Sequence, residues 1–240
     1  MILLLLALQV AAGTDDRFDR CVALIAGDPA AARAAATQWR VEGGGWFARQ
    51  CAGMAYTREA NWPAAAAEFE AAARDAETGR DARASSYWAQ SGNAWLAANE
   101  PAKARTALDA SLASGGLTGL QRGEAQLDRA RALVALGETG PARSDLDAAL
   151  KSAGDDPLAW LLSATLARRT GDLSRARSDI AEALRRSPDD ASVQLESGNI
   201  AALGGDEASA RNAWSQAARA APDSDVGRSA AAALKQFDAR

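Results

Sequence analysis

Apolar residues recur at intervals of three and four along residues 157–187, in two segments separated by a short polar break. Their positions are Trp160, Leu161, Ala164 and Ala167 in the first segment and Ala176, Ile180, Ala183 and Leu184 in the second. This spacing places apolar side chains on one face of an α-helix. Gly171 and Asp172 interrupt the pattern, and Pro188 ends it. The segment is therefore predicted to form two helices that pack as a hairpin.

The same pattern returns at one fixed interval over the second half of the chain. A glycine, an alanine, a large apolar residue and a second alanine hold equivalent places in three consecutive segments. The three sets are Gly137, Ala142, Leu146 and Ala149; Gly171, Ala176, Ile180 and Ala183; and Gly205, Ala210, Trp214 and Ala217. A fixed period of this length is typical of chains built from stacked helical units, none of which buries its apolar face alone.

Further units fit upstream with longer connections. Their equivalent alanines, Ala65, Ala104 and Ala142, are more widely spaced than those of the later units, so the loops near 77–81 and 114–118 are expected to be longer. A divergent unit precedes them, and a single helix after Pro222 is expected to cover the last hairpin. The predicted boundaries are approximately 14–43 for the divergent unit, then 44–80, 81–118, 119–156, 157–190 and 191–222, with a capping helix at 223–240.

This pattern resembles the tetratricopeptide repeat (TPR), a 34-residue helix-turn-helix unit with a small–large–small pattern in its second helix. The matching positions of the clearest unit are Trp160, Gly171, Ala176, Ile180, Ala183 and Pro188. The resemblance implies an all-α, right-handed superhelical solenoid of about five to six units, forming a single domain over 14–240. It also implies a concave groove lined by the first helices. Other helical repeats with slightly longer units are the alternative, because several units lack the full set of aromatic residues.

The segment 1–13 is typical of a secretory signal peptide. An apolar stretch of about a dozen residues ends in Ala11, Ala12 and Gly13, and it is shorter than the roughly 20 residues that a membrane-spanning helix needs. No membrane span is therefore expected, and the prediction is an exported, periplasmic protein. The stretch lacks a preceding Lys or Arg, so a buried N-terminal helix of a cytoplasmic protein is the alternative.

The separation of the two cysteines, Cys21 and Cys51, is close to one repeat. They are expected to lie on the first helices of neighbouring units, which pack side by side. In an oxidising compartment an even number of cysteines permits a disulfide between them. The alternative is that both are small apolar residues of a helical core.

Composition argues against catalysis and against nucleic acid. The chain has no histidine and only two cysteines, so it lacks the commonest general base and any zinc-binding spacing. No cofactor or metal is expected. The net charge of −4 is spread without long runs of one sign, which argues against a nucleic-acid partner. The Gly43–Gly45 run is interpreted as a linker, and the pairs Asp155–Asp156 and Asp189–Asp190 as helix caps.

Residues of the first helices that hairpin packing does not use are expected to face the groove. These partner-groove candidates are Gln50, Met54, Arg58, Asn93, Leu96, Leu127, Arg131, Leu161, Thr165, Arg168, Leu195 and Asn199. Three leucines among them, Leu127, Leu161 and Leu195, hold the same place in successive units and would form an apolar strip, unless they belong to the core between repeats. The arginines and asparagines would donate hydrogen bonds, unless they form a solvated face.

The groove predicts a non-catalytic scaffold or adaptor of the periplasm or cell envelope that binds a protein or peptide segment, extended or helical. A groove clamp for a C-terminal carboxylate is not predicted, because the asparagines at the expected register lack a lysine partner. The alternative is a structural subunit that assembles with itself, as a homo-oligomer, or with an envelope complex through its convex or terminal faces. An accessory domain of an enzyme has little support, because no catalytic domain shares the chain.

Overall fold

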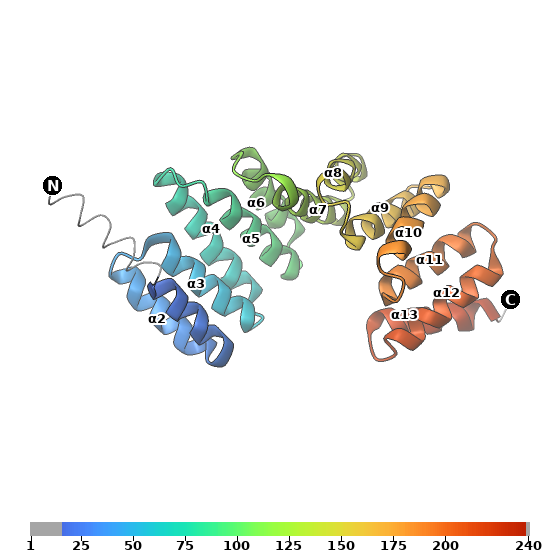
Figure 1. The fold of residues 1–240 in the computed structure, drawn as a ribbon, viewed down its shortest axis with the longest axis horizontal. Helices are drawn as coiled ribbons and strands as arrows, with labels where there is room; N and C mark the ends of the chain where they lie inside the picture. Colours follow the sequence, from blue (N-terminus) through green and yellow to red (C-terminus); the bar gives the residue numbers. More distant parts are fainter. Residues whose placement is uncertain (1–15, 239–240) are drawn as a thin grey trace. The chain divides into compact units, whose positions relative to one another are not determined.

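The computed structural model describes residues 16–238, and in this range every regular element is a helix (Figure 1). The helices form two compact units, the first ending at Leu136 and the second beginning at Gly137. The sequence led us to expect a single solenoid from residue 14 to 240, and the boundary between the units lies inside the predicted 119–156 repeat. The signal peptide predicted at 1–13 lies outside the described residues.

Both units are runs of consecutive helices joined by short turns. In the N-terminal unit they are a helix over residues 16–27, α2 (Pro29–Val41), α3 (Gly45–Arg58), α4 (Trp62–Thr78), α5 (Ala84–Ala97), α6 (Pro101–Ala113) and α7 (Gly119–Ala135). In the C-terminal unit they are α8 (Thr139–Ser152), α9 (Pro157–Arg169), α10 (Leu173–Arg186), α11 (Ala191–Leu203), α12 (Glu207–Ala220) and α13 (Asp225–Asp238). The longest connections of the N-terminal unit are the loops 79–83 and 114–118.

The recurring glycines mark turns that need a left-handed backbone. Gly137, Gly171 and Gly205 all have φ between 79° and 85°, a region in which a Cβ atom is unfavourable. In the N-terminal unit Ala60 and Asn99 hold the equivalent turn positions, with φ of 56° and 58°. The N-terminal unit therefore keeps the same turn conformation without a glycine at these two positions.

Aspartates begin several helices, as the sequence predicted for two of them. The Asp156 carboxylate accepts a hydrogen bond from the Leu158 amide at 2.9 Å, and the Asp190 carboxylate accepts bonds from the Ser192 and Val193 amides at 2.8 and 2.9 Å. Each bond satisfies an amide that the first turn of a helix leaves without a partner. These two carboxylates are helix caps.

A disulfide joins the first helices of the two N-terminal hairpins. Cys21 on the 16–27 helix and Cys51 on α3 are bonded, with Cα atoms 6.2 Å apart. Both are buried, at 3% and 0% exposure, in a cluster of small residues that includes Ala36 and Ala55. The bond therefore lies inside the packing between two neighbouring hairpins.

Several hairpins pack a glycine of the first helix against a large residue of the second, 16 positions later. The pairs are Gly53 with Phe69, Gly92 with Leu108, and Gly198 with Trp214. A Cβ atom added at Gly53 would lie 2.7 Å from the Phe69 ring, which is too close for carbon atoms. The small residues therefore set how closely the two helices of a hairpin approach.

Gly198→Ala is expected to destabilise the C-terminal unit by about 2 kcal/mol, because the new methyl group overlaps the Trp214 indole. An ordinary Gly→Ala change in a helix stabilises it by up to about 1 kcal/mol. Gly140→Ala is the matched control, since Gly140 lies in α8 and a Cβ there would meet nothing within 4 Å. Urea denaturation followed by circular dichroism should give opposite signs for the two variants, and equal effects would contradict this packing account.

Candidate functional site

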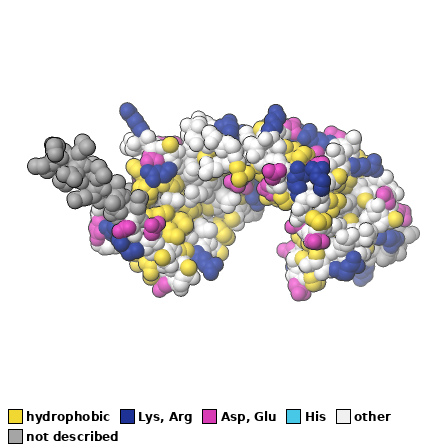
Figure 2. All heavy atoms as spheres, viewed as in Figure 1, with side chains coloured by type: hydrophobic (Ala, Val, Ile, Leu, Met, Phe, Trp, Pro, Cys, Tyr) yellow, Lys and Arg dark blue, Asp and Glu magenta, His cyan; other side chains and the backbone are white. Residues whose placement is uncertain are grey.

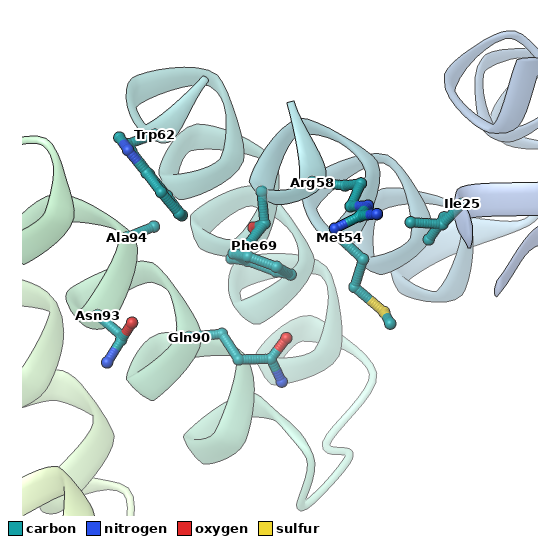
Figure 3. A pocket seen from close by; sticks show the side chains of 9 residues that line it. Ile25, Met54, Arg58, Trp62, Phe69, Gln90, Asn93 and Ala94 are labelled. Atoms are coloured by element: carbon teal, nitrogen blue, oxygen red, sulfur yellow. The ribbon is translucent and has the colours of Figure 1, made fainter. Parts of the chain in front are cut away.

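The N-terminal unit contains a pocket of about 380 Å³ between the 16–27 helix and helices α3, α4 and α5. Its lining residues are Ile25, Met54, Thr57, Arg58, Trp62, Phe69, Gln90, Asn93 and Ala94. Figure 3 shows the Phe69 ring between the Met54 and Ile25 side and the Trp62 and Ala94 side of the pocket. The pocket wall is thus mainly apolar, with amide and guanidinium groups at its edges.

Small residues of the first helices leave room for a large side chain of a second helix to reach this pocket. Phe69 lies on α4 and reaches the lining beside Gly53 of α3 and Ala94 of α5. Phe69 is itself 4% exposed, so most of the ring is covered by its neighbours. In the space-filling view, hydrophobic side chains gather over the α3–α4 part of this unit, with charged side chains around them (Figure 2).

A second pocket of about 270 Å³ adjoins the first and shares two of its residues, Gln90 and Asn93. Its other lining residues are Ser86, Ala89, Leu117, Gln121, Glu124, Ala125 and Asp128, from α5, α7 and the loop before α7. This wall is more polar and carries two carboxylates. Together the pockets form one groove, which we call the N-terminal groove, across the first helices α3, α5 and α7.

One of those carboxylates is held by neighbouring side chains. The Asn93 amide donates to Asp128 Oδ2 at 2.9 Å, and Arg131 donates to Asp128 Oδ1 at 2.9 Å. The predicted groove residues Asn93 and Arg131 therefore meet at Asp128, which the sequence interpretation had not included. Glu124, by contrast, has no hydrogen bond or ion pair to any residue in the described part of the chain.

Four of the predicted residues lie in or directly beside this groove, and two lie deeper. Met54, Arg58 and Asn93 line it, and Arg131 borders it through Asp128. Leu96 is half-buried against the α6–α7 cluster. Leu127 is only 3% exposed, as expected from the alternative in which it belongs to the core between repeats.

Gln50 is held from the neighbouring helix instead of facing an open groove. The Tyr87 hydroxyl on α5 donates to Gln50 Oε1 on α3 at 3.2 Å. Burial raises the pKa of Tyr87 to about 12, so the phenol keeps the proton that it donates. This bond joins α3 to α5.

The predicted residues of the C-terminal unit are bonded mainly to one another. Arg168 donates to both oxygens of Glu196, at 2.6 and 3.2 Å, and the Asn199 amide donates to the same carboxylate at 3.2 Å. The Trp214 indole then donates to Asn199 Oδ1 at 3.1 Å. A pocket of about 490 Å³ beside this network is lined in part by Phe237 of α13. The polar groups of the network are already engaged.

The remaining predicted residues of this unit are half-buried. Leu161 packs against the cluster of Ile180 and Val193, and Leu195 packs against the cluster that contains Trp214. Thr165 is also half-buried. For both leucines the structure places part of the side chain in the core between helices.

The sequence interpretation missed residues that complete the N-terminal groove. Trp62 and Phe69 lie on a second helix, whereas the groove was predicted from first helices alone. Gln90 and Gln121 lie on first helices but do not repeat at a fixed period. Gly53 could have indicated Phe69, because a small residue in a first helix predicts that a large side chain of the second helix packs against it.

A family model described as Tetratricopeptide repeat matches residues 127–179 and 161–225. The chain contains tetratricopeptide repeats over residues 127–225. Its TPR fold is that of a protein–protein interaction scaffold, and proteins of this family generally act without catalysis. No curated protein sequence matches the chain.

Several solved structures share this fold at low sequence identity. PilF of Pseudomonas aeruginosa is 16% identical with a TM-score of 0.72, covering 95% of this chain and 99% of PilF. PilW, described as a widely conserved type IV pilus biogenesis factor, is 18% identical with a TM-score of 0.72, covering 90% and 96%. YrrB, described as a TPR protein with an unusual peptide-binding site, is 19% identical with a TM-score of 0.59, covering 78% and 91%.

Among residues 16–238 no helix combines the length and apolar character needed to cross a membrane. The same residues contain no group of three or more histidine, cysteine or acidic side chains placed to hold a metal ion.

Proposed function

We propose that this TPR protein is a scaffold that binds an extended segment of a partner protein in the N-terminal groove. The observation that carries the proposal is the continuity of two pockets across three successive first helices. The apolar part can bury a large side chain, and the polar part can bond a peptide backbone. YrrB, which has a similar fold, is described as having a peptide-binding site.

We further propose that the protein works in the periplasm or cell envelope. The disulfide between Cys21 and Cys51 would persist only in an oxidising compartment, and the apolar residues before position 14 are typical of an export signal. The fold similarity to a type IV pilus biogenesis factor supports the same location. Fractionation of cells that express the full chain should place it with periplasmic markers, and cytosolic recovery of the bulk protein would overturn this location.

Groove binding can be tested with a random dodecapeptide library displayed on phage and selected on the immobilised full chain. Enriched peptides would be synthesised and their Kd values measured by fluorescence anisotropy. Met54→Gln, which keeps the side-chain length but adds a polar amide to the apolar pocket, should raise Kd about 10-fold. Lys151→Gln on the exposed end of α8 is the control. Failure to enrich any peptide, or an unchanged Kd for Met54→Gln, would overturn the proposal.

A further inference from the structure

Each end of the N-terminal groove carries a charged side chain that forms no ion pair with a residue between 16 and 238, and the two charges are of opposite sign. Arg58 lines the apolar pocket at one end, and Glu124 lines the polar pocket at the other. Many charged side chains of this unit take part in ion pairs, such as Arg49 with Asp75 and Arg33 with Glu59. Arg58 and Glu124 differ from these residues, because neither forms an ion pair with a described residue.

At the first end, Arg58 is the one charged side chain of an otherwise uncharged lining. It is exposed and has no hydrogen bond or ion pair to a residue between 16 and 238. In Figure 3 it lies beside Met54 and Ile25, at the margin of the apolar surface. A guanidinium group in this position can form two parallel hydrogen bonds with a carboxylate while the rest of the ligand stays on the apolar wall.

At the second end, two carboxylates line the polar pocket. Asp128 is bonded to Asn93 and Arg131, and so it is partly neutralised. Glu124 is exposed and lacks any such partner in the described chain. This end therefore favours a cationic group, and it disfavours a second carboxylate by repulsion.

The side chains between the two ends suit an extended backbone. Gln90 and Gln121 line the groove, and neither amide has a hydrogen-bond partner among the described residues, so their donors and acceptors remain open. Contacts tie the three helices together, through Tyr87 to Gln50 for α3 and α5 and through Asn93 to Asp128 for α5 and α7. The helices that carry the charges are thus joined by these two side-chain hydrogen bonds.

The length of the segment follows from helix packing. Neighbouring helices lie about 8–10 Å apart, so the path from α3 across α5 to α7 is on the order of 20 Å. An extended chain advances about 3.3 Å per residue, and about six residues therefore cover this path.

We infer that the N-terminal groove selects a partner segment of opposite end charges, in which a large apolar residue lies between an acidic and a basic residue. The acidic side chain pairs with Arg58, the apolar side chain enters the pocket beside Phe69, and the basic side chain faces Glu124 and Asp128. This inference rests on the proposed groove-binding function and adds its charge specificity. A segment with the two charges exchanged meets like charges at both ends.

The same phage selection tests this inference, with sequences of the enriched peptides as the readout. We expect one fixed order and spacing of acidic, apolar and basic residues. Arg58→Glu and Glu124→Lys should each raise the Kd of the best peptide about 10-fold. The double variant should prefer a version of that peptide in which the acidic and basic residues are exchanged. Arg169→Glu and Asp189→Lys, at exposed positions of the C-terminal unit, are matched controls that should leave Kd unchanged.

The possible failures are distinguishable. Peptides that require Met54 but carry no charge pattern, or that tolerate Arg58→Glu and Glu124→Lys, would overturn the charge inference and leave groove binding intact. Absence of any enriched peptide would overturn both. Preserved circular dichroism spectra and melting temperatures of the variants would confirm that changes in Kd arise in the groove.

Discussion

Asp179→Ala is expected to lower the free energy of unfolding of the C-terminal unit by about 3 kcal/mol, because it removes the acceptor of a buried polar network. Asp179 is 5% exposed. It accepts hydrogen bonds from the Ser163 hydroxyl and, at 3.2 Å, from Arg175 Nε. Alanine would leave a fully buried hydroxyl and part of a guanidinium group without their partner.

The network links three successive helices, so the loss should spread beyond α10. Arg143 of α8 donates to Ser163 Oγ of α9 at 2.9 Å and to Asp147 at 3.1 Å. Arg175 of α10 also bonds Asp147. Burial, followed by repulsion from Arg175, lowers the pKa of Arg143, whereas the carboxylates of Asp147 and Asp179 act in the opposite direction.

Hydrogen exchange measured by mass spectrometry should show faster exchange in α8, α9 and α10 of the Asp179→Ala variant, together with a lower urea midpoint. Asp189→Ala is the control, since Asp189 is exposed in the loop before α11. Asp179→Asn keeps the size and one acceptor, so its loss should be smaller than that of alanine. A midpoint shift no larger than that of Asp189→Ala would show that the network contributes little to stability.

A signal for this network was present in the sequence. Asp145 and Asp179 hold the same place in successive repeats, and both are buried, at 6% and 5% exposure. They precede the large apolar residues Leu146 and Ile180, which the repeat pattern did identify. An acidic residue that recurs at a core position predicts a buried polar partner. Its donors could not be named from sequence, because they come from other helices.

The hairpin boundaries were predictable because they depend on local chemistry. Period and turn residues gave the boundaries of the repeat units, and α3 to α13 lie within those boundaries. The division of the chain at Leu136 and Gly137 was not predictable, because apolar positions of the same kind occur on both sides of it. The residues that recur in every repeat determine packing inside each hairpin and do not determine how one repeat packs on the next.

The site was predictable only in part, for a related reason. Helical register located Met54, Arg58 and Asn93, which line the N-terminal groove. The same register left open whether Leu127 lies on an apolar strip of the groove or in the core between repeats, and the structure buries it. Whether a first-helix residue faces solvent or the adjacent repeat depends on how each repeat is rotated relative to the next repeat. That rotation is set by side-chain volumes that the period does not report.

Removing the disulfide by Cys21→Ala together with Cys51→Ala is expected to cost roughly 3 kcal/mol in the oxidised protein, because the bond closes a loop of 30 residues in the unfolded chain. The sequence interpretation proposed this pairing from the repeat spacing, and the two half-cystines lie on neighbouring first helices. Ile25 and Met54, on those same two helices, line the groove. Loss of the disulfide should therefore loosen the wall of the groove that Ile25 and Met54 form, as well as the N-terminal hairpin.

Hydrogen exchange of residues 16–58, compared between wild type and the double variant, measures this effect where it arises. Wild-type protein treated with a reductant should behave like the variant, and the variant itself should not respond to reductant. Because repeat proteins can unfold in parts, exchange in α9–α12 should remain unchanged in both. Two free thiols in protein recovered from an oxidising compartment, or equal exchange in all samples, would show that the bond does not hold the N-terminal hairpin to its neighbour.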